Sequence, residues 1–227
     1  IRAALAFHEQ LETARDGLPY EVDGSVVKVD DFALQKRLGT LNRSPRWAIA
    51  FKFAPRQETT RVLDIAASVG RTGTLTPVAV LEPVRIGGVT VEHATLHNQD
   101  EIDRLDVRIG DTVLVERAGD VIPKVVKVVR ERRPDDAVPY RLPASCPICG
   151  DAAVRGSGEV ALRCPNPRCP AKLRERILHF ASREALDVDG LGEKLVDQLV
   201  EAELVKRPSD LFELSAAQLA GLARMGE

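Results

Sequence analysis

The chain has 227 residues, of which 44% are hydrophobic and 29% are charged, and its formal net charge is −2. These values are typical of a soluble globular protein made of one large domain or several small ones. No apolar run approaches the roughly 18 residues needed to cross a bilayer, so we expect no membrane-spanning helix and no membrane partner.

The average charge hides a strong asymmetry along the chain. Residues 1–59, 60–140, 141–183 and 184–227 carry net charges of +1, −2, +5 and −6. A basic stretch between acidic neighbours suits a local contact with phosphate better than a uniformly charged surface would. The low overall charge therefore does not exclude a nucleic-acid partner.

The first sixty residues mix helical and strand patterns. We expect a helix over 1–14, a β-rich run over 20–29 that Gly24 interrupts, a short helix over 32–38 that Gly39 ends, and a strand over 46–53 that Pro55 ends. This part of the chain is predicted to have an α+β fold.

The pattern changes near residue 60, where short β-rich runs recur between turn residues. They cover 61–69, 77–85, 89–92, 112–116 and 121–129, with one helical stretch over 98–105. About 70 residues with five strands and a short helix fit a small closed barrel of the OB type. A Greek-key sandwich is the alternative.

A proline-rich and charged stretch over 130–145 is interpreted as a linker, and the segment with all the cysteines follows it. Beyond Pro170 the pattern becomes helical, over 171–185, 192–203 and 215–224. Residues 190–192 (GLG) are predicted to form a tight turn between two helices.

The four cysteines have the spacing Cys146-x2-Cys149-x14-Cys164-x4-Cys169. Two short-range pairs can supply the four thiolates of a tetrahedral zinc site, and four protein ligands leave no open position, so we expect a structural metal. A segment with few large apolar side chains needs such a metal as its core. Two disulfides or free thiols are the alternatives, and His179 is interpreted as a surface histidine rather than a ligand.

Strand alternation divides residues 47–53 into two faces. Trp47, Ile49, Phe51 and Phe53 are predicted to face the core, and Ala48, Ala50 and Lys52 the other side. An amine beside small side chains suits a pocket for a phosphate or another anion. An exposed edge lysine above a thin surface is the alternative.

A second lysine strand covers residues 23–29 (DGSVVKV). Asp23 and Lys28 have opposite parity, so on a regular strand their side chains would point apart. Only a bulge or bend near Gly24 would bring both to one site.

Several segments together resemble the bacterial NAD⁺-dependent DNA ligases. Residues 18–29 (LPYEVDGSVVKV) resemble their fourth nucleotidyltransferase motif and 48–53 (AIAFKF) their fifth. Residues 69–73 (VGRTG), 76–79 (TPVA), 94–98 (ATLHN) and 117–123 (RAGDVIP) resemble parts of their OB-fold, and 187–192 (DVDGLG) the start of their helix-hairpin-helix region. The match runs through nearly the whole chain in the family's order.

The resemblance implies a multidomain protein. Its parts would be the end of an α+β adenylation (nucleotidyltransferase) domain over 1–58, an all-β OB barrel over 59–140, a four-cysteine zinc finger over 141–172 and the start of an α-helical helix-hairpin-helix domain over 173–227.

The family's chemistry has three steps. A lysine attacks the α-phosphorus of NAD⁺, the AMP moves to the 5′-phosphate of a nick, and the 3′-hydroxyl displaces the AMP. Each step is an in-line phosphoryl transfer that positive charge and Mg²⁺ or Mn²⁺ promote. The resemblance thus implies NAD, Mg (or Mn) and Zn as cofactors and nicked duplex DNA as partner. It also implies a monomer in the bacterial cytoplasm, associated with the nucleoid, that acts in replication and repair.

The resemblance also implies roles for single residues. Lys28 and Lys52 would contact the AMP phosphate in catalysis, Asp23 and Arg15 would help bind the nucleotide, Arg71 and Arg46 would contact DNA, and backbone N–H groups of the Gly190–Gly192 turn would bind a phosphate. A plain helix–helix connection is the alternative for that turn.

The chain lacks the Lys-x-Asp-Gly motif that carries the nucleophile in the family. The segment over 28–31 (KVDD) comes near it, but Asp31 replaces the required glycine. We therefore expect a fragment that cannot form a lysine–AMP adduct by itself. The alternative is a non-catalytic OB-plus-zinc DNA-binding module. A helicase or topoisomerase fragment would be expected to show repeated zinc ribbons or a phosphate-binding P-loop, and the sequence contains neither.

Overall fold

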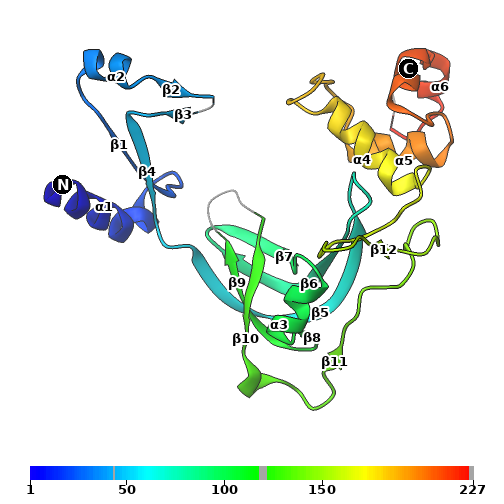
Figure 1. Cartoon of the computed structure of the whole chain (residues 1–227), viewed down its shortest axis with the longest axis horizontal. Coiled ribbons are helices and arrows are strands. Elements are labelled where there is room, and N and C mark those ends of the chain that lie inside the picture. The colour runs from blue at the N-terminus through cyan, green and yellow to red at the C-terminus, as the bar shows by residue number, and fades with distance from the viewer. Residues whose placement is uncertain (43, 118–121, 225–227) are drawn as a thin grey trace.

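The computed structural model describes residues 1–42, 44–117 and 122–224. Its modules follow one another along an arc, with a barrel at the base, the N-terminal segment on one arm and the C-terminal helices on the other (Figure 1). None of the helices in these ranges combines the length and the apolar character required to cross a membrane.

The N-terminal segment is a helix packed on a two-stranded sheet. Helix α1 (Arg2–Ala14) and the 3-10 helix η1 (Arg15–Gly17) precede strand β1 (Gly24–Lys28), which pairs in antiparallel fashion with β4 (Ala48–Lys52). Between these strands lie α2 (Phe32–Leu38) and the short pair β2 (Thr40–Leu41) and β3 (Ser44–Pro45). The predicted helices and the second strand are confirmed, and β1 begins only at Gly24.

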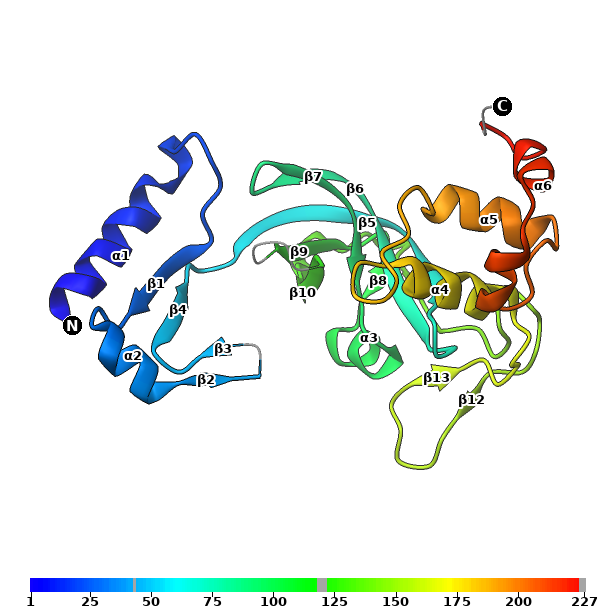
Figure 2. The same cartoon turned by 90° about the horizontal axis from the view of Figure 1, so that it is seen from above.

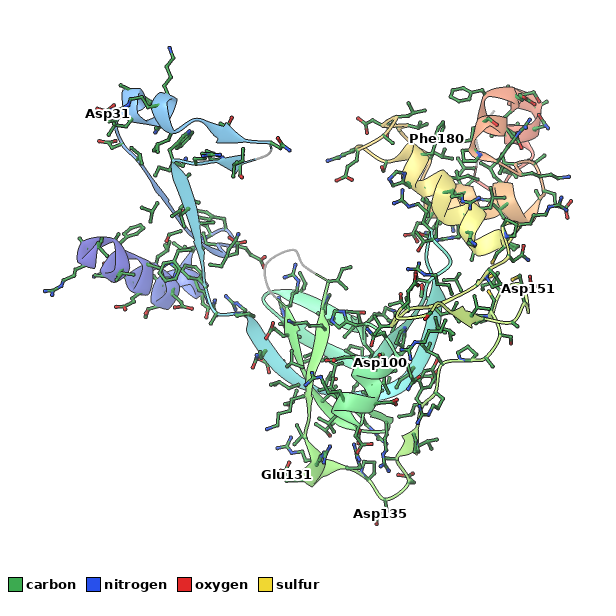
Figure 3. The ribbon with its side chains drawn as sticks, in the orientation of Figure 1. Asp31, Asp100, Glu131, Asp135, Asp151 and Phe180 are labelled. Carbon is green, nitrogen blue, oxygen red and sulfur yellow. The ribbon has the colours of Figure 1, made fainter. Side chains whose placement is uncertain are left out.

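Local capping explains the bounds of α2. The Asp31 carboxylate, labelled in Figure 3, accepts the N–H of Leu34 at 2.9 Å and so caps the first turn. Gly39 ends the helix with a φ of 71°, a conformation that glycine adopts without a Cβ penalty.

Helix α1 covers one face of the β1–β4 pair through His8. The buried imidazole stacks on Phe51 at 3.9 Å between ring centroids, and its Nδ1 lies 2.8 Å from Ser25 Oγ. The prediction that the bulky face of residues 47–53 forms a core is nevertheless wrong in part. Phe53 is buried, but Ile49 is 71% and Phe51 44% exposed. Within the described residues, helix α1 alone is too narrow to cover the whole face of the β1–β4 pair.

The middle of the chain is a closed five-stranded barrel. Its strands are β5 (Arg56–Val69), β6 (Leu75–Ile86), β7 (Val89–Thr95), β9 (Thr112–Arg117) and β10 (Lys124–Val128). They close in the order β10-β7-β6-β5-β9, with β10 parallel to β7 and antiparallel to β9. This topology confirms the OB barrel and excludes the two-sheet sandwich.

The barrel interior is filled by aliphatic side chains from every strand. Helix α3 (Gln99–Leu105) adds Ile102, and Asn98 caps that helix by accepting the N–H of Glu101 at 2.9 Å. The strand and helix pattern predicted for this region is thus confirmed. Residues 118–121 of the predicted motif over 117–123 lie outside the described residues, as do 225–227 at the C-terminal end.

The stretch interpreted as a linker is fastened to the barrel over its first half. Strand β11 (Val138–Pro139) pairs with β8 (Arg108–Ile109), and Arg133 reaches back into the barrel wall. Hydrogen bonds to Asp111 and then Asp106 raise the pKa of the Arg133 guanidinium. The linker interpretation is therefore wrong for residues 130–139, which belong structurally to the barrel.

The cysteine module is small and contains little regular structure. Strands β12 (Val154–Arg155) and β13 (Leu162–Arg163) form a two-residue ladder between the two cysteine pairs. Arg155 of β12 also makes an ion pair with Asp100 of α3, at 2.6 Å between Nη2 and Oδ1, and Figure 3 labels that carboxylate. The module is thus tied to the barrel by charge as well as by packing.

The C-terminal helices have their own core. Helices α4 (Pro170–Ala181), α5 (Glu193–Glu201) and α6 (Ala216–Ala220) and the 3-10 helix η3 (Pro208–Glu213) surround a set of buried aliphatic side chains, Ile177, Val196, Leu199 and Val205. On the rim, Phe180 of α4 meets Phe212 edge to face at 6.1 Å. The three predicted helices are confirmed, with shorter bounds.

The first of these helices ends four residues earlier than predicted. Ser182 takes an extended conformation, and its N–H and side chain both bond to the His179 carbonyl. The connection to α5 is consequently the eleven-residue stretch 182–192 rather than a tight turn. Gly190 has a φ of 78° within it, and Gly192 caps α5.

Candidate functional site

A cleft of about 960 Å³ lies between the N-terminal segment and the barrel. Its walls come from η1 and the loop before β1 on one side, and from the β4–β5 junction and the β6–β7 turn on the other. The charged side chains in it are Arg15, Asp16, Glu21, Asp23, Lys52, Arg56 and Arg117. Four of these are cationic and three acidic, so the cleft can accept an anion near its basic groups.

Lys52 and Asp23 form one of the ion pairs that line this cleft. The Lys52 Nζ lies 2.5 Å from Asp23 Oδ2, and both side chains remain more than half exposed. Solvent screens such a pair, so both groups stay accessible to a ligand. The structure therefore brings together two of the residues that the sequence singled out.

Gly24 makes this pairing possible because it lies directly opposite Lys52 in the strand register. A Cβ on Gly24 would come within 2.3 Å of the Phe51 carbonyl oxygen. Asp23 lies just before the first residue of β1, so the parity rule for a regular strand no longer governs its side chain. A bulge or bend near Gly24 would be needed to bring Asp23 and Lys28 to one site, but the β1–β4 register runs from Gly24 to Lys28 without a shift, and Asp23 pairs with Lys52 instead.

Lys28 lies at the far end of the same strand pair. The register places it opposite Ala48, and Gly24 opposite Lys52, so both lysines project from one face of the ladder. Four register steps separate them, which corresponds to about 13 Å along the strand. Lys28 does not line the cleft that holds Lys52. The resemblance implies that both lysines contact the AMP phosphate, and the structure places them on one face of the ladder, at its opposite ends.

Arg15 lines the cleft from η1. Its guanidinium stacks 5.7 Å from the centre of the Phe53 ring, and Nη1 donates to the Ala54 carbonyl at 3.4 Å. Arg46 is exposed, lies just before β4 and does not line the cleft. Of the two basic positions that the resemblance singled out near the motifs, only Arg15 is near the Lys52–Asp23 pair.

The junction between the two modules is held by residues that sequence reasoning missed. The Glu12 carboxylate accepts the N–H of Ala54 at 3.1 Å, and Asp16 makes an ion pair with Arg56. The Asp16 and Arg56 positions are 40 residues apart, so no local pattern could reveal their contact.

The four cysteines converge on one point. All four Sγ atoms lie within 4.8 Å of one another, with Cys146 and Cys169 at 3.8 Å and Cys149 and Cys164 at 3.5 Å. Ligands about 2.3 Å from a tetrahedral zinc ion are separated by roughly 3.8 Å, and the two separations above are close to that value, so the cluster fits the metal. None of the four is in a disulfide, which removes that alternative.

The thiols of the cluster differ in their pKa values. Burial raises the pKa of the Cys164 thiol to about 12. At Cys146, burial acts in the same direction, but backbone N–H groups of Cys149 and Ile148 outweigh it and lower the pKa to about 7. A zinc ion would hold all four as thiolates, and His179 is exposed on α4 outside the cluster.

The remaining predicted contacts lie on the surface. Arg71 is exposed in the β5–β6 loop, and no other described residue bonds to its side chain. Gly190 and Gly192 are exposed before α5, whose first turn carries the acidic Glu193. The Glu193 carboxylate is paired with Arg174, so it does not face the turn uncompensated.

Sequence models of known domain families match three consecutive parts of the chain. The NAD-dependent DNA ligase adenylation domain matches residues 1–56, the OB-fold domain of the same ligases 59–137, and their C4 zinc finger domain 145–171. All three matches are to domains of the NAD-dependent DNA ligases, and they follow one another along the chain. The chain belongs to the NAD-dependent DNA ligase family.

Curated relatives support the assignment. A DNA ligase of Syntrophus aciditrophicus (strain SB) is 56% identical over 227 residues, which is 100% of this chain and 34% of the relative. DNA ligases of Desulfosudis oleivorans and Geobacter sulfurreducens are also 56% identical, over 33% and 34% of their lengths. The chain thus spans about a third of the length of the curated relatives it matches.

Proposed function

We propose that the chain is the part of an NAD⁺-dependent DNA ligase that joins the adenylate site to the DNA-binding modules. The ligase would seal nicks with a 5′-phosphate and a 3′-hydroxyl through lysine–AMP and DNA–adenylate intermediates. The observation that carries the proposal is the Lys52–Asp23 pair in a cleft between the adenylation segment and the OB barrel. The relatives' name, DNA ligase, supports the same reading.

In this proposal the lysine face of β1 and β4 receives the adenylate. Lys52 and Arg15 lie in the cleft and would stabilise the negative charge that builds on the AMP phosphate, because fixed cations act there without reorganisation. Lys28 would contact the nucleotide from the other end of the face, and the small side chains of Ala48 and Ala50 leave room between the two lysines.

A divalent cation, Mg²⁺ or Mn²⁺, would neutralise charge on the phosphates when bound. Asp23 would help bind the nucleotide, on its sugar or near that cation. Its carboxylate is already in place beside Lys52, and its side chain is 52% exposed. Exposure of this degree leaves oxygen atoms available for a ligand.

The DNA contacts would come from the other modules. Arg71 on the barrel and Arg46 on the N-terminal segment would bind phosphate or the minor groove, and the Gly190–Gly192 turn would present backbone N–H groups to a phosphate. The helices from α4 onward would form the start of a helix-hairpin-helix domain. The zinc-finger match ends at residue 171. The support for a helix-hairpin-helix domain is therefore the DVDGLG segment and the helical fold beyond it.

The domain limits 1–58, 59–140, 141–172 and 173–227 belong to the proposal. So do nicked duplex DNA and NAD as substrates, a monomeric state and a place in the bacterial cytoplasm near the nucleoid. The cysteines Cys146, Cys149, Cys164 and Cys169 would hold one structural zinc ion.

A chimaeric ligase tests the proposal. The chain replaces the aligned third of the Syntrophus aciditrophicus relative, and sealing of a 5′-phosphorylated nick is measured with NAD⁺ and Mg²⁺. We expect sealing, and we expect Lys52→Ala to lower its rate about 100-fold or more, as loss of a group that stabilises developing charge does. Lys36→Ala, an exposed lysine of α2, is the matched control and should seal normally.

A chimaera that folds and binds DNA but never seals would favour the non-catalytic DNA-binding module. Full activity in Lys52→Ala would remove the role of Lys52. Incubating the isolated chain with labelled NAD⁺ and Mg²⁺ completes the test. A covalent adenylate on this chain would contradict the proposal that the nucleophile lies outside residues 1–227.

A further inference from the structure

The β5–β6 loop, residues 70–74, lies against the second cysteine pair. Arg163 Nη1 donates to Thr72 Oγ1 at 3.1 Å and to Thr74 Oγ1 at 2.7 Å. The next residue, Cys164, donates its N–H to the Gly73 carbonyl at 2.8 Å. Two consecutive residues of the cysteine module therefore hold one short loop of the barrel by three hydrogen bonds.

The two ends of this loop are anchored in the same place. Val69 and Leu75 flank the loop and are 7% and 1% exposed. Both pack in one apolar cluster with Cys146, Cys164 and Cys169. The cysteines therefore contact the loop at both of its ends, through Val69 and Leu75, and near its centre, through Gly73.

Lys172 of α4 is buried at the contact between the loop and the cysteines. Its side chain reaches Cys164, where Nζ donates to the carbonyl oxygen at 3.2 Å, and the residue is 7% exposed. Burying an ammonium is costly unless opposite charge or hydrogen bonds compensate it. The hydrogen bond to Cys164 offsets part of this cost, and a zinc ion bound by the four thiolates would add a net charge of −2 to the same module.

Gly73 completes this contact. It has a φ of 84°, and a Cβ there would lie 2.6 Å from the Cys164 carbonyl oxygen and 3.2 Å from Lys172 Nζ. No space separates the loop, the cysteine backbone and the ammonium. Arg71, two residues before Gly73, extends from the loop into solvent, and no other described residue bonds to its side chain.

We propose that Lys172 is a positioning residue that couples zinc binding to the DNA-facing loop. Its ammonium, bonded to the Cys164 carbonyl oxygen, fixes Cys164 against Gly73 and so sets the direction in which Arg71 points. The coupling of metal to loop stands on the contacts above. Only its consequence for DNA rests on the proposed function, in which Arg71 binds a phosphate.

The first test uses Lys172→Met in the full chain, which keeps most of the side-chain volume and removes the donor and the charge. We expect zinc to pass to a colorimetric chelator about 10-fold faster or more, in the range reported for outer partners of metal ligands. Amide hydrogen exchange over residues 70–74 should also become faster. Lys36→Met, at an exposed position of α2, is the matched control and should change neither rate.

Two further measurements keep the test decisive if Lys172→Met does not fold. In the wild-type chain, removing zinc should speed exchange in the 70–74 loop, while the buried strand β9 keeps its protection. Gly73→Ala should loosen the same loop from its other side, because the added Cβ meets the Cys164 carbonyl. Unchanged loop exchange after metal removal, or in Lys172→Met, would overturn the coupling.

DNA binding tests the functional step separately. On nicked duplex, Lys172→Met and Arg71→Ala should each lower the salt dependence of binding by about one phosphate contact, and the double variant should lower it no further. An additive double variant would overturn the positioning role. If the wild-type chain does not bind DNA at all, the proposed function fails, while zinc release and loop exchange still decide the coupling.

Discussion

Arg133 donates two hydrogen bonds, at 2.8 and 2.9 Å, to the carboxylate of Asp111, a residue with no exposed surface. The same guanidinium also reaches Asp106. This contact fastens the segment after β10 to the barrel wall and compensates a fully buried carboxylate. The chain that leads from the barrel to the cysteine module is therefore fixed at its origin.

Replacing Arg133 by Met should destabilise the barrel by about 3 kcal/mol, because it leaves the buried Asp111 carboxylate without its charge partner. Urea denaturation followed by the β-sheet circular dichroism measures the loss. Arg132→Met, at the exposed neighbouring position, should change stability by less than about 0.5 kcal/mol. Equal effects of the two substitutions would contradict the role of the buried pair.

The stability of the barrel should fall in acid. The hydrogen bond from Arg133 lowers the pKa of Asp106, so the contribution of this carboxylate is present above its unfolded pKa and is lost as the pH falls through its lower folded pKa. Melting temperatures from pH 7 to pH 2.5 should therefore differ between wild type and Asp106→Asn at neutral pH and converge at low pH. A constant difference across this range would exclude the linkage. Asp135→Asn, at an exposed position, is the control.

The cysteine cluster should contain one zinc ion per chain, and removing the metal should unfold residues 146–170. Elemental analysis gives the stoichiometry, and amide exchange follows the unfolding. Thiol titration after chelation should find all four cysteines free without reductant, since none is in a disulfide. A metal-free protein with a folded cysteine module would show that the apolar packing is sufficient without zinc.

Arg71→Ala should weaken binding to nicked duplex and reduce the slope of log K against log salt by about one, as expected for the loss of one phosphate contact. Fluorescence anisotropy at several salt concentrations measures both quantities. Arg37→Ala removes the same charge from an exposed position of α2 and should leave the slope unchanged. An unchanged slope in Arg71→Ala would remove this residue from the DNA contacts.

Gly24→Ala should disrupt the pairing of β1 with β4, because the new Cβ would collide with the Phe51 carbonyl oxygen. The displacement would move Lys52, which lies opposite Gly24, and we expect the chimaeric ligase to lose most of its sealing rate. Gly17→Ala is the matched control, since no atom lies within 4 Å of its added Cβ. Full sealing by Gly24→Ala would show that the close approach is not required.

The barrel and the metal cluster could be predicted from the sequence because both follow from local patterns. Alternating apolar residues specify strands such as β6, and the spacing of Cys146 and Cys149 specifies a knuckle. The contacts that escaped prediction join distant positions. Asp16 with Arg56, Asp111 with Arg133 and Gly73 with Cys164 depend on how modules meet, which no periodicity encodes.

Two errors have a different origin. Ile49 has the alternation of a core residue and yet is exposed, because alternation reports a face and not what covers it. The early end of α4 depends on the extended backbone of Ser182, a residue whose hydroxyl bonds to a carbonyl of the last turn and competes with the helix. Lys28 and Lys52 share a face because of the register between β1 and β4, and alternation within either strand carries no information on that register or on their separation.

Strand β5 runs as one element from Arg56, in the cleft, to Val69, beside the 70–74 loop (Figure 2). The length of β5 therefore fixes the distance between the cleft and the 70–74 loop. The strand is irregular only at the bulge near Val62. Inserting two residues into β5 would keep the alternation of inward and outward side chains and would lengthen the strand by about 7 Å. Such an insertion would also shift the pairing of β5 with β9 and β6, so the distance between the cleft and the loop cannot change without changing the barrel.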